Sequence, residues 1–298
     1  AQVEIAPEAL EEVAATRERV EELAQDPTPV YGISTGFGAL ARRHIPEEMR
    51  AQLQLSLVRS HAAGTGPEVE EEVIRALMLL RLSTLCTGRT GVRPVVVETY
   101  AKALNAGIVP VVREYGSLGC SGDLAPLAHC ALALLGEGEV RVNGELQDAG
   151  EALAAAGIEP LQLREKEGLA LINGTDGMLG QLCLAITDLR AAAKTADIAT
   201  AMTVEGLLGT LVVFADDLQQ LRPHPGQADA AANILQVAEG SEILEAALEE
   251  FKKNQVQDAY SVRCAPQVAG GFRDTLAHTA QVAERELAAA VDNPVVTK

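Results

Sequence analysis

Apolar residues recur at helical spacing along most of this chain. Between residues 68 and 85, Val69, Val73, Leu77 and Leu80 lie three or four positions apart, which places them on one face of an α-helix. Similar spacing predicts further helices at residues 7–23, 46–59, 94–106, 124–135, 178–221 (as one helix or more), 227–238, 242–252 and about 266–291. The pattern therefore predicts a mainly α protein.

The predicted helix at 266–291 carries apolar residues around its circumference. They are Val268, Phe272, Leu276, Val282, Leu287 and Val291. A helix that is apolar on several sides is typical of the middle of a bundle. We therefore expect this helix to be buried on several sides.

Residues 139–146 alternate in the manner of a strand pair. Asn143-Gly144 stands between the two halves of Glu-Val-Arg-Val-Asn-Gly-Glu-Leu. Asn-Gly favours a type I′ turn, because both positions accept positive φ angles. This segment predicts one small β-hairpin.

Composition narrows the class of protein. Trp is absent and aromatic residues make up 3% of the 298 residues, which is typical of helices that pack through small side chains. The net charge of −18 argues against nucleic acid or an anionic membrane as a partner, because both favour a basic surface.

Cysteine and histidine usage predicts no metal site. The five cysteines include no Cys-x-x-Cys pair, and the five histidines have no ligand spacing. The most apolar window, residues 206–215, is shorter than the ~20 residues that cross a bilayer. With scattered, reduced thiols this predicts a soluble cytoplasmic protein.

The most informative chemistry lies at Cys120-Ser121-Gly122. Gly122 has no Cβ, so its amide nitrogen can fold back onto the carbonyl carbon of Cys120. Loss of two water molecules then gives a methylidene-imidazolone, an electrophile that no ordinary side chain supplies. Asp123 is a good N-cap for the helix at 124–135, whose N-terminal dipole would withdraw electron density from the ring. The alternative is a glycine-rich turn that feeds a helix.

Three further segments carry candidate side chains. Tyr31 lies in a loop with three glycines, residues 30–38, which no Lys follows as a phosphate-binding loop requires. His61 ends a predicted helix, where a histidine is also a favourable charge placement. Asn173 ends an apolar run, where an Asn-Gly turn can simply cap a helix.

A fourth segment, residues 254–267, places an amide, a phenol and a guanidinium ahead of the long helix. Arg263 can hold a carboxylate with two parallel hydrogen bonds. Tyr260 can donate a hydrogen bond or relay a proton, and Gln257 can hold a polar group. The alternative is a hydrogen-bonded loop that supports the bundle.

In their order along the chain, these segments resemble the histidine and aromatic amino-acid ammonia-lyases. The resemblance implies a methylidene-imidazolone prosthetic group formed from Cys120, Ser121 and Gly122. It also implies roles for six other residues: Tyr31 as the catalytic base, Tyr260 as a donor to the ring oxygen or a proton relay, and His61, Asn173, Gln257 and Arg263 in substrate binding.

Within this family, Cys-Ser-Gly, the pair Ser60-His61 and the stretch 165–168 resemble the bacterial histidine ammonia-lyases. That group converts L-histidine to trans-urocanate. A tyrosine or phenylalanine lyase, or an aminomutase, is the alternative among enzymes. A catalytically silent helical scaffold is the alternative outside them.

The resemblance also implies an architecture. The fold expected is a long-helix bundle of the ammonia-lyase and fumarase–aspartase type. It has an N-terminal domain at residues 1–175, which carries the prosthetic-group loop, and the first part of a central bundle at 176–298. Family members are homotetramers and continue well beyond residue 294, so we expect this chain to lack their C-terminal part or to need a complementing chain.

Overall fold

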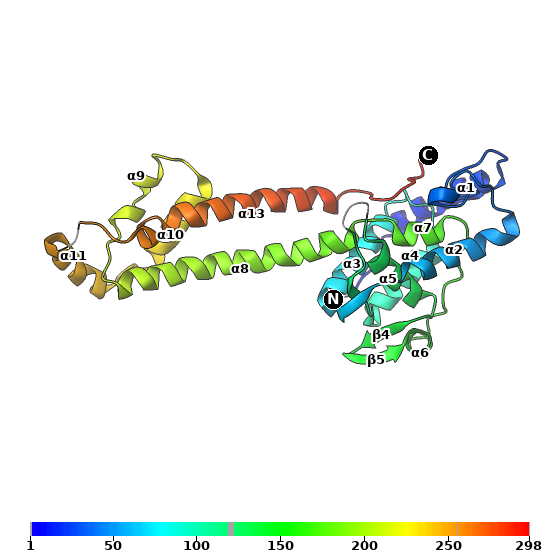
Figure 1. The fold of residues 1–298 in the computed structure, drawn as a ribbon, viewed down its shortest axis with the longest axis horizontal. Helices are drawn as coiled ribbons and strands as arrows, with labels where there is room; N and C mark the ends of the chain where they lie inside the picture. The colour runs from blue at the N-terminus through cyan, green and yellow to red at the C-terminus, as the bar shows by residue number, and fades with distance from the viewer. Residues whose placement is uncertain (1, 119–121, 255, 298) are drawn as a thin grey trace. The chain divides into compact units, whose positions relative to one another are not determined.

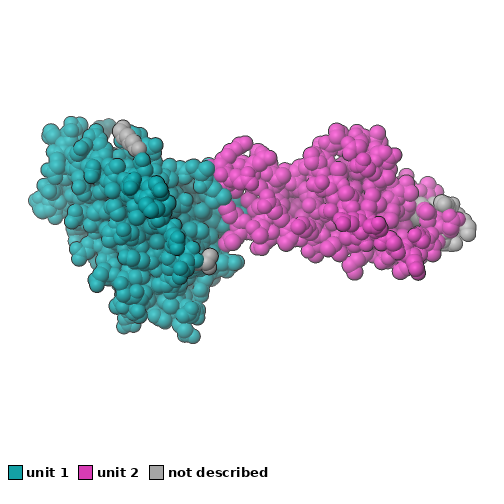
Figure 2. Space-filling model, turned by 180° about the vertical axis from the view of Figure 1, so that it is seen from behind, with its two compact units in different colours: residues 1–182, 286–298 teal, residues 183–285 magenta. Residues whose placement is uncertain are grey.

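The computed structural model describes residues 2–118, 122–254 and 256–297. The chain forms two compact units, Ala1–Leu182 with Glu286–Lys298 (unit 1) and Cys183–Arg285 (unit 2) (Figure 2). These bounds differ from the predicted division at residue 175. The first boundary falls inside a continuous helix, and residues 286–298 return to unit 1, where the Val296 N–H donates to the Arg89 carbonyl at 2.8 Å.

Unit 1 is built largely from helices (Figure 1). They are α1 (Pro7–Gln25), the 3₁₀ turn η1 (Gly38–Leu40), α2 (Glu47–His61), α3 (Glu71–Leu85), α4 (Pro94–Asn105), α5 (Leu124–Leu134), α6 (Ala149–Ala155), α7 (Glu167–Ile172) and the first residues of α8 (Asp176–Gly206). Helical spacing predicted all of these elements except the three shortest, η1, α6 and α7, which hold too few turns to show a periodicity.

Unit 2 contains the rest of α8, a 3₁₀ turn and five further helices. They are η2 (Val212–Phe214), α9 (Asp216–Gln219), α10 (Pro225–Val237), α11 (Glu242–Asn254), α12 (Tyr260–Arg263) and most of α13 (Ala265–Leu287). The mainly α architecture with long helices is therefore confirmed.

The predicted hairpin is also confirmed. Strands β4 (Glu139–Val142) and β5 (Glu145–Asp148) pair antiparallel, and Asn143 and Gly144 take φ angles of 52° and 81°, as a type I′ turn requires. Strand β2 (Ile108–Pro110) pairs with β4 and completes a three-stranded sheet.

A second small sheet was not predicted. Strand β1 (Thr65–Glu68) pairs antiparallel with β3 (Arg113–Tyr115). The sequence of β1, Thr-Gly-Pro-Glu, is rich in residues that are rare in strands, so its pattern indicates only a break. The helix predicted from residue 68 accordingly begins at Glu71.

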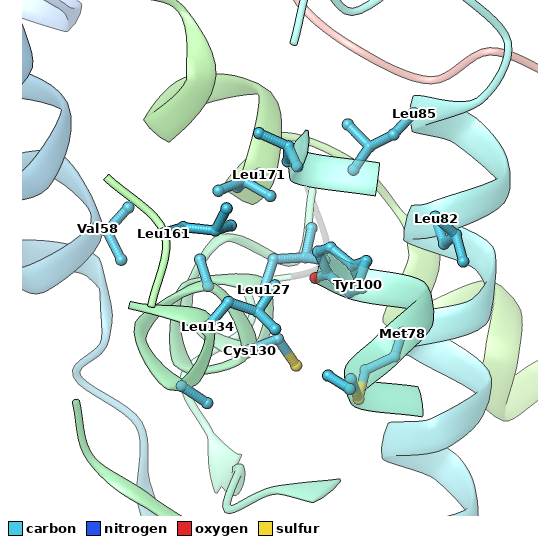
Figure 3. Packing of buried hydrophobic residues seen from close by; sticks show 14 of the residues in the cluster. Val58, Met78, Leu82, Leu85, Tyr100, Leu127, Cys130, Leu134, Leu161 and Leu171 are labelled. Atoms are coloured by element: carbon cyan, nitrogen blue, oxygen red, sulfur yellow. The ribbon is translucent and has the colours of Figure 1, made fainter. Parts of the chain in front are cut away.

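The main core of unit 1 gathers around α5. Its labelled members in Figure 3 are Val58, Met78, Leu82, Leu85, Tyr100, Leu127, Cys130, Leu134, Leu161 and Leu171, all buried. Helix α5 contacts α2, α4, α6 and α7. Because its sequence is almost entirely apolar, it is buried on most sides and gives a fixed base to the loop at its N-terminus.

The prediction of burial around α13 is wrong for this chain. Val268, Phe272, Val282 and Leu287 are exposed, whereas Leu276, Ala280 and Ala283 are buried. The core of unit 2 lies instead among Ala201, Val204, Phe214, Ala231, Ile234, Ala238, Leu244 and Val262. One side of α13 thus has no cover within the described residues of unit 2.

One described stretch, Glu167–Gly206, is long and apolar enough to cross a membrane by length and composition. This stretch differs from residues 206–215, which the sequence indicates as the most apolar window. Of its most apolar window, 44% is buried inside the protein, and all six residues of α7 are buried. A helix that lines a protein core passes the same test, so this stretch is weak evidence for a membrane span.

Candidate active site

Gly122 is held in a conformation that favours glycine. Its φ is +120°, and a Cβ at this position would lie 2.7 Å from the carbonyl oxygen of Gly174. The same oxygen accepts a hydrogen bond from the Asp123 N–H at 2.7 Å. A side chain at residue 122 is therefore excluded both by conformation and by space. Cys120 and Ser121 lie outside the described residues.

The prediction that the Asp123 side chain caps α5 is wrong. Asp123 occupies the N-cap position, but its carboxylate makes no capping hydrogen bond there. It accepts instead from Ser117 Oγ at 2.7 Å and from the Met178 N–H at 2.8 Å. Met178 is in the first turn of α8, where N–H groups lack partners within the helix, so the buried carboxylate satisfies α8 rather than α5.

His61 and Gly122 line one cavity of about 310 Å³ in unit 1. The lining residues are Ser60, His61, Ala63, Gly116, Leu118, Gly122, Leu124 and Ala125. His61 Nδ1 lies 2.9 Å from the Leu57 carbonyl oxygen, so Nδ1 carries a proton and donates. In the neutral ring this makes Nε2 an acceptor.

His129 holds the loop that follows His61. The Gly64 N–H donates to His129 Nε2 at 3.1 Å, which requires that nitrogen to be unprotonated. Burial, together with the nearby Arg113, lowers the pKa of His129. Both effects favour the neutral ring, and His129 therefore supports the site from α5.

Tyr31 lies in a folded loop beside α2. Its ring is half-buried against the main core and meets Phe37 edge-to-face at 6.2 Å between centroids. Gln54 connects this loop to α7, since its Nε2 donates to the Gly32 carbonyl and its Oε1 accepts from the Leu169 N–H. Tyr31 is not among the described residues that line the His61–Gly122 cavity.

Asn173 follows α7 and adjoins the glycine that contacts Gly122. Its side-chain Nδ2 donates to the Asn293 carbonyl at 2.6 Å, and its backbone carbonyl accepts from Arg81 Nη1 at 2.7 Å. The side chain does not cap α7. It joins the Asn173 turn to the segment that carries Asn293.

Sequence reasoning missed a group of buried charges beneath this turn. Arg81 lies 3.3 Å from Asp176, whose pKa burial raises, and Lys166 Nζ lies 2.6 Å from Asp292. Glu167 is also buried and accepts from the side chain and the N–H of Arg93. The sequence feature that could have indicated these buried charges is a charged residue within an apolar helical run. Arg81, which lies among Met78, Leu82 and Leu85, is an example.

Gln257, Tyr260 and Arg263 all belong to unit 2. The guanidinium carbon of Arg263 stands 3.9 Å from the centroid of the Tyr260 ring, a cation–π contact. Gln257 and Tyr260 are exposed. Beside them, Asp258 Oδ2 accepts from the Thr210 N–H at 2.9 Å, which holds the segment in place.

No metal centre is visible in the part of the chain that the structure describes. There, no group of three or more His, Cys, Asp or Glu side chains is arranged to hold a metal ion.

Known proteins resemble this chain over its whole length. A histidine ammonia-lyase of Streptomyces coelicolor is 62% identical over 297 residues, which are 99% of this chain and 58% of that protein. Among solved structures, a tyrosine aminomutase of Streptomyces globisporus has a TM-score of 0.91 and 40% identity, over 100% of this chain and 59% of that one. A histidine ammonia-lyase of Trypanosoma cruzi has a TM-score of 0.88 and 38% identity, over 100% and 54%.

The chain thus spans somewhat more than half the length of the relatives it matches. The aromatic amino acid lyase family matches residues 1–298. Together with the long-helix fold and the glycine-only site at Gly122, this match shows that the chain belongs to the aromatic amino acid lyase family.

Proposed function

We propose that this chain supplies catalytic loops of a histidine ammonia-lyase, which eliminates ammonia from L-histidine to give trans-urocanate. The observation that carries the proposal is the shared cavity of His61 and Gly122. It brings an imidazole, able to hydrogen-bond another imidazole, next to the segment expected to form the electrophile. The names of relatives at 62% identity support the same substrate.

The prosthetic group proposed is a methylidene-imidazolone. The amide nitrogen of Gly122 bonds to the carbonyl carbon of Cys120, whose oxygen leaves as water with the amide protons of Gly122 and Ser121. Ser121 then loses its hydroxyl group and its Cα proton as a second water, so no oxidant or reductant is needed. The φ of +120° and the close approach of Gly174 at Gly122 suit this backbone chemistry.

When formed, the ring supplies an electrophile that activates the substrate for loss of its amine. The other roles fall to side chains. Tyr31 is proposed to remove the β-proton as a general base. His61 orients the imidazole of the substrate.

The remaining proposed roles belong to other polar side chains. Arg263 holds the substrate carboxylate and Gln257 its polar end. Tyr260 donates to the ring oxygen or relays a proton. Asn173 contacts the ring or the substrate amine. The cation–π contact between Arg263 and Tyr260 supports a role for these two as a pair.

A lyase or aminomutase for tyrosine or phenylalanine is the second candidate. The likeness to a tyrosine aminomutase at 40% identity favours it. His61 argues for histidine over phenylalanine, because its Nε2 can accept a hydrogen bond from the N–H of a substrate imidazole, whereas a phenyl ring offers no such donor.

We further propose that the chain works in the cytoplasm as part of a larger assembly, either a homotetramer or a complex with a complementing chain. Unit 2 exposes apolar side chains, among them Met202, Val268 and Phe272. An apolar cavity of about 680 Å³ lies between α8, α12 and α13. Exposed apolar surface of this kind marks interaction sites.

Intact-mass spectrometry tests the central proposal. The chain is expected to be lighter than its sequence by two water molecules, and the deficit is expected to vanish in Ser121→Ala. Urocanate formation is then followed from L-histidine, with L-tyrosine and L-phenylalanine in parallel. The assay uses the chain alone and the chain mixed with a polypeptide that matches the rest of its relatives' length.

Each outcome has a separate meaning. An unmodified mass under both conditions overturns the prosthetic-group proposal. A modified chain that prefers tyrosine or phenylalanine overturns the substrate. A single size by light scattering that matches one chain, with or without the added polypeptide, overturns the assembly.

A further inference from the structure

We propose that Arg81 and Asp176 are positioning residues that hold Gly122 in its left-handed conformation through the peptide of Gly174. This proposal rests on the proposed function in one respect, namely that the conformation of Gly122 serves ring closure. The contacts among Arg81, Asp176, Gly174 and Gly122 do not depend on that function.

Gly174 is closely packed on two sides. A Cβ on Gly174 would collide with Arg81 Nη1 and Asp176 Oδ2 on one side. On the other side its carbonyl oxygen would lie 2.7 Å from a Cβ on Gly122, and it accepts from the Asp123 N–H at 2.7 Å. Contact therefore runs from Arg81 and Asp176, across Gly174, to Gly122.

Arg81 is itself held from several directions. Its side chain is fully buried on α3. Nη1 donates to the Asn173 carbonyl at 2.7 Å, and Nη2 donates to the Val291 carbonyl at 3.1 Å. A planar guanidinium with two directed donors fixes the peptides that accept from it, which a flexible ammonium would not do.

Asp176 completes this support. Its Oδ1 accepts from Thr84 Oγ1 at 3.2 Å, and its Oδ2 lies 3.3 Å from Arg81 Nη1. A buried ion pair contributes little net stability compared with well-packed apolar residues. Its effect at this place is geometric, because both side chains pack against Gly174, whose carbonyl oxygen contacts Gly122.

The consequence concerns the direction of the Gly122 amide nitrogen. Rotation about the N–Cα bond of Gly122, its φ angle, decides how the peptide that contains this nitrogen is turned relative to the Asp123 peptide. The bond from the Asp123 N–H to Gly174 fixes one end of this rotation. Loss of the support beneath Gly174 would free the angle and slow any reaction that needs the nitrogen turned back.

The test is the double variant Arg81→Met/Asp176→Asn, which removes the donors without leaving a charge unpaired. Hydrogen exchange at the Asp123 amide and the intact mass are measured together. Protection of this amide is expected to fall by about tenfold or more, the factor of one ordinary hydrogen bond. The two-water deficit is expected to be lost. Arg75→Met, on the same helix but bonded to the Leu104 carbonyl, is the matched control and should retain both.

The result that would overturn the inference is a folded double variant with full protection of the Asp123 amide. Should the double variant fail to fold, Gly174→Ala gives the same test with both charges in place. If the parent chain shows no two-water mass deficit, only the proposal of ring formation is overturned. In that case the exchange rate of the Asp123 amide still decides whether Arg81 and Asp176 position Gly122.

Discussion

Lys166 Nζ lies 2.6 Å from Asp292 Oδ2, and neither side chain is exposed to solvent. Burial lowers the pKa of Lys166 and raises that of Asp292, while each charge opposes the shift of the other. The pair joins the residue that precedes α7 to the segment after α13. This is one of the contacts through which residues 286–298 belong to unit 1.

Asp292→Ala is expected to lower the free energy of unfolding by about 3–5 kcal/mol, because it leaves a buried ammonium without its partner. Lys166→Met/Asp292→Leu, which removes both charges, should cost much less. Urea denaturation followed by circular dichroism measures both. The exposed pair Arg19–Glu22 provides the control, and Glu22→Ala should change little. Equal effects of Asp292→Ala and Glu22→Ala would contradict the argument.

Stability is expected to depend on pH through His129. Its pKa is lowered in the folded state, so below the ordinary value of about 6.5 the unfolded chain binds a proton that the folded chain does not. The free energy of unfolding should therefore fall as the pH is lowered from about 6.5 toward the folded-state pKa. Denaturation at a series of pH values measures the slope.

His129→Gln should flatten that slope, since its amide oxygen can still accept from the Gly64 N–H but does not titrate. His278→Gln replaces an exposed histidine and serves as the control for the substitution itself. An unchanged slope in His129→Gln would exclude His129 as the titrating group.

Substitution by alanine is expected to change the stability in opposite directions at two glycines. Gly144 has a φ of +81° in the hairpin turn, so Gly144→Ala should destabilise the chain by about 1 kcal/mol. Gly271 lies within α13 with nothing near its would-be Cβ, so Gly271→Ala should stabilise by about 0.5–1 kcal/mol. Thermal denaturation of the two variants against the parent gives the signs. Shifts in the same direction would refute the assignment of the turn.

Tyr31→Phe is expected to lower urocanate formation by about 10²–10⁴-fold, the usual contribution of a general base. The two-water mass deficit should be kept, because ring closure does not need the phenol. Tyr115→Phe, at an exposed tyrosine in β3, is the matched control and should keep its activity. Retention of full activity in Tyr31→Phe would show that another group takes the β-proton.

Local pattern was sufficient for the longer helices and for the hairpin. The helices show their spacing over several turns, and Asn143-Gly144 determines its turn without help from the rest of the chain. Strand β1 and helices α6, α7 and α12 were not predicted. They are short, and long-range pairing or packing rather than local preference decides them.

The candidate site divides in the same way. Gly122 and His61 could be found from motifs, and the structure brings both to one cavity. The partners of Asp123 could not, because Ser117 and Met178 reach its carboxylate only after α5 and α8 have come together. Arg81 was also overlooked, since its acceptors lie 92 and 210 residues away in sequence.

The discontinuity of unit 1 bears on the order of events during synthesis. Residues 286–298 leave the ribosome after the whole of unit 2, yet Val296 packs with Val20, Ala24 and Ile33 near the start of the chain. While unit 2 is still being translated, this cluster lacks a member and Lys166 lacks its carboxylate. Unit 1 therefore reaches its final packing only after unit 2 has been translated, long after its own first 182 residues. Nascent chains arrested inside unit 2 should accordingly be cleaved by proteases near Ile33 and Lys166 more readily than released chains.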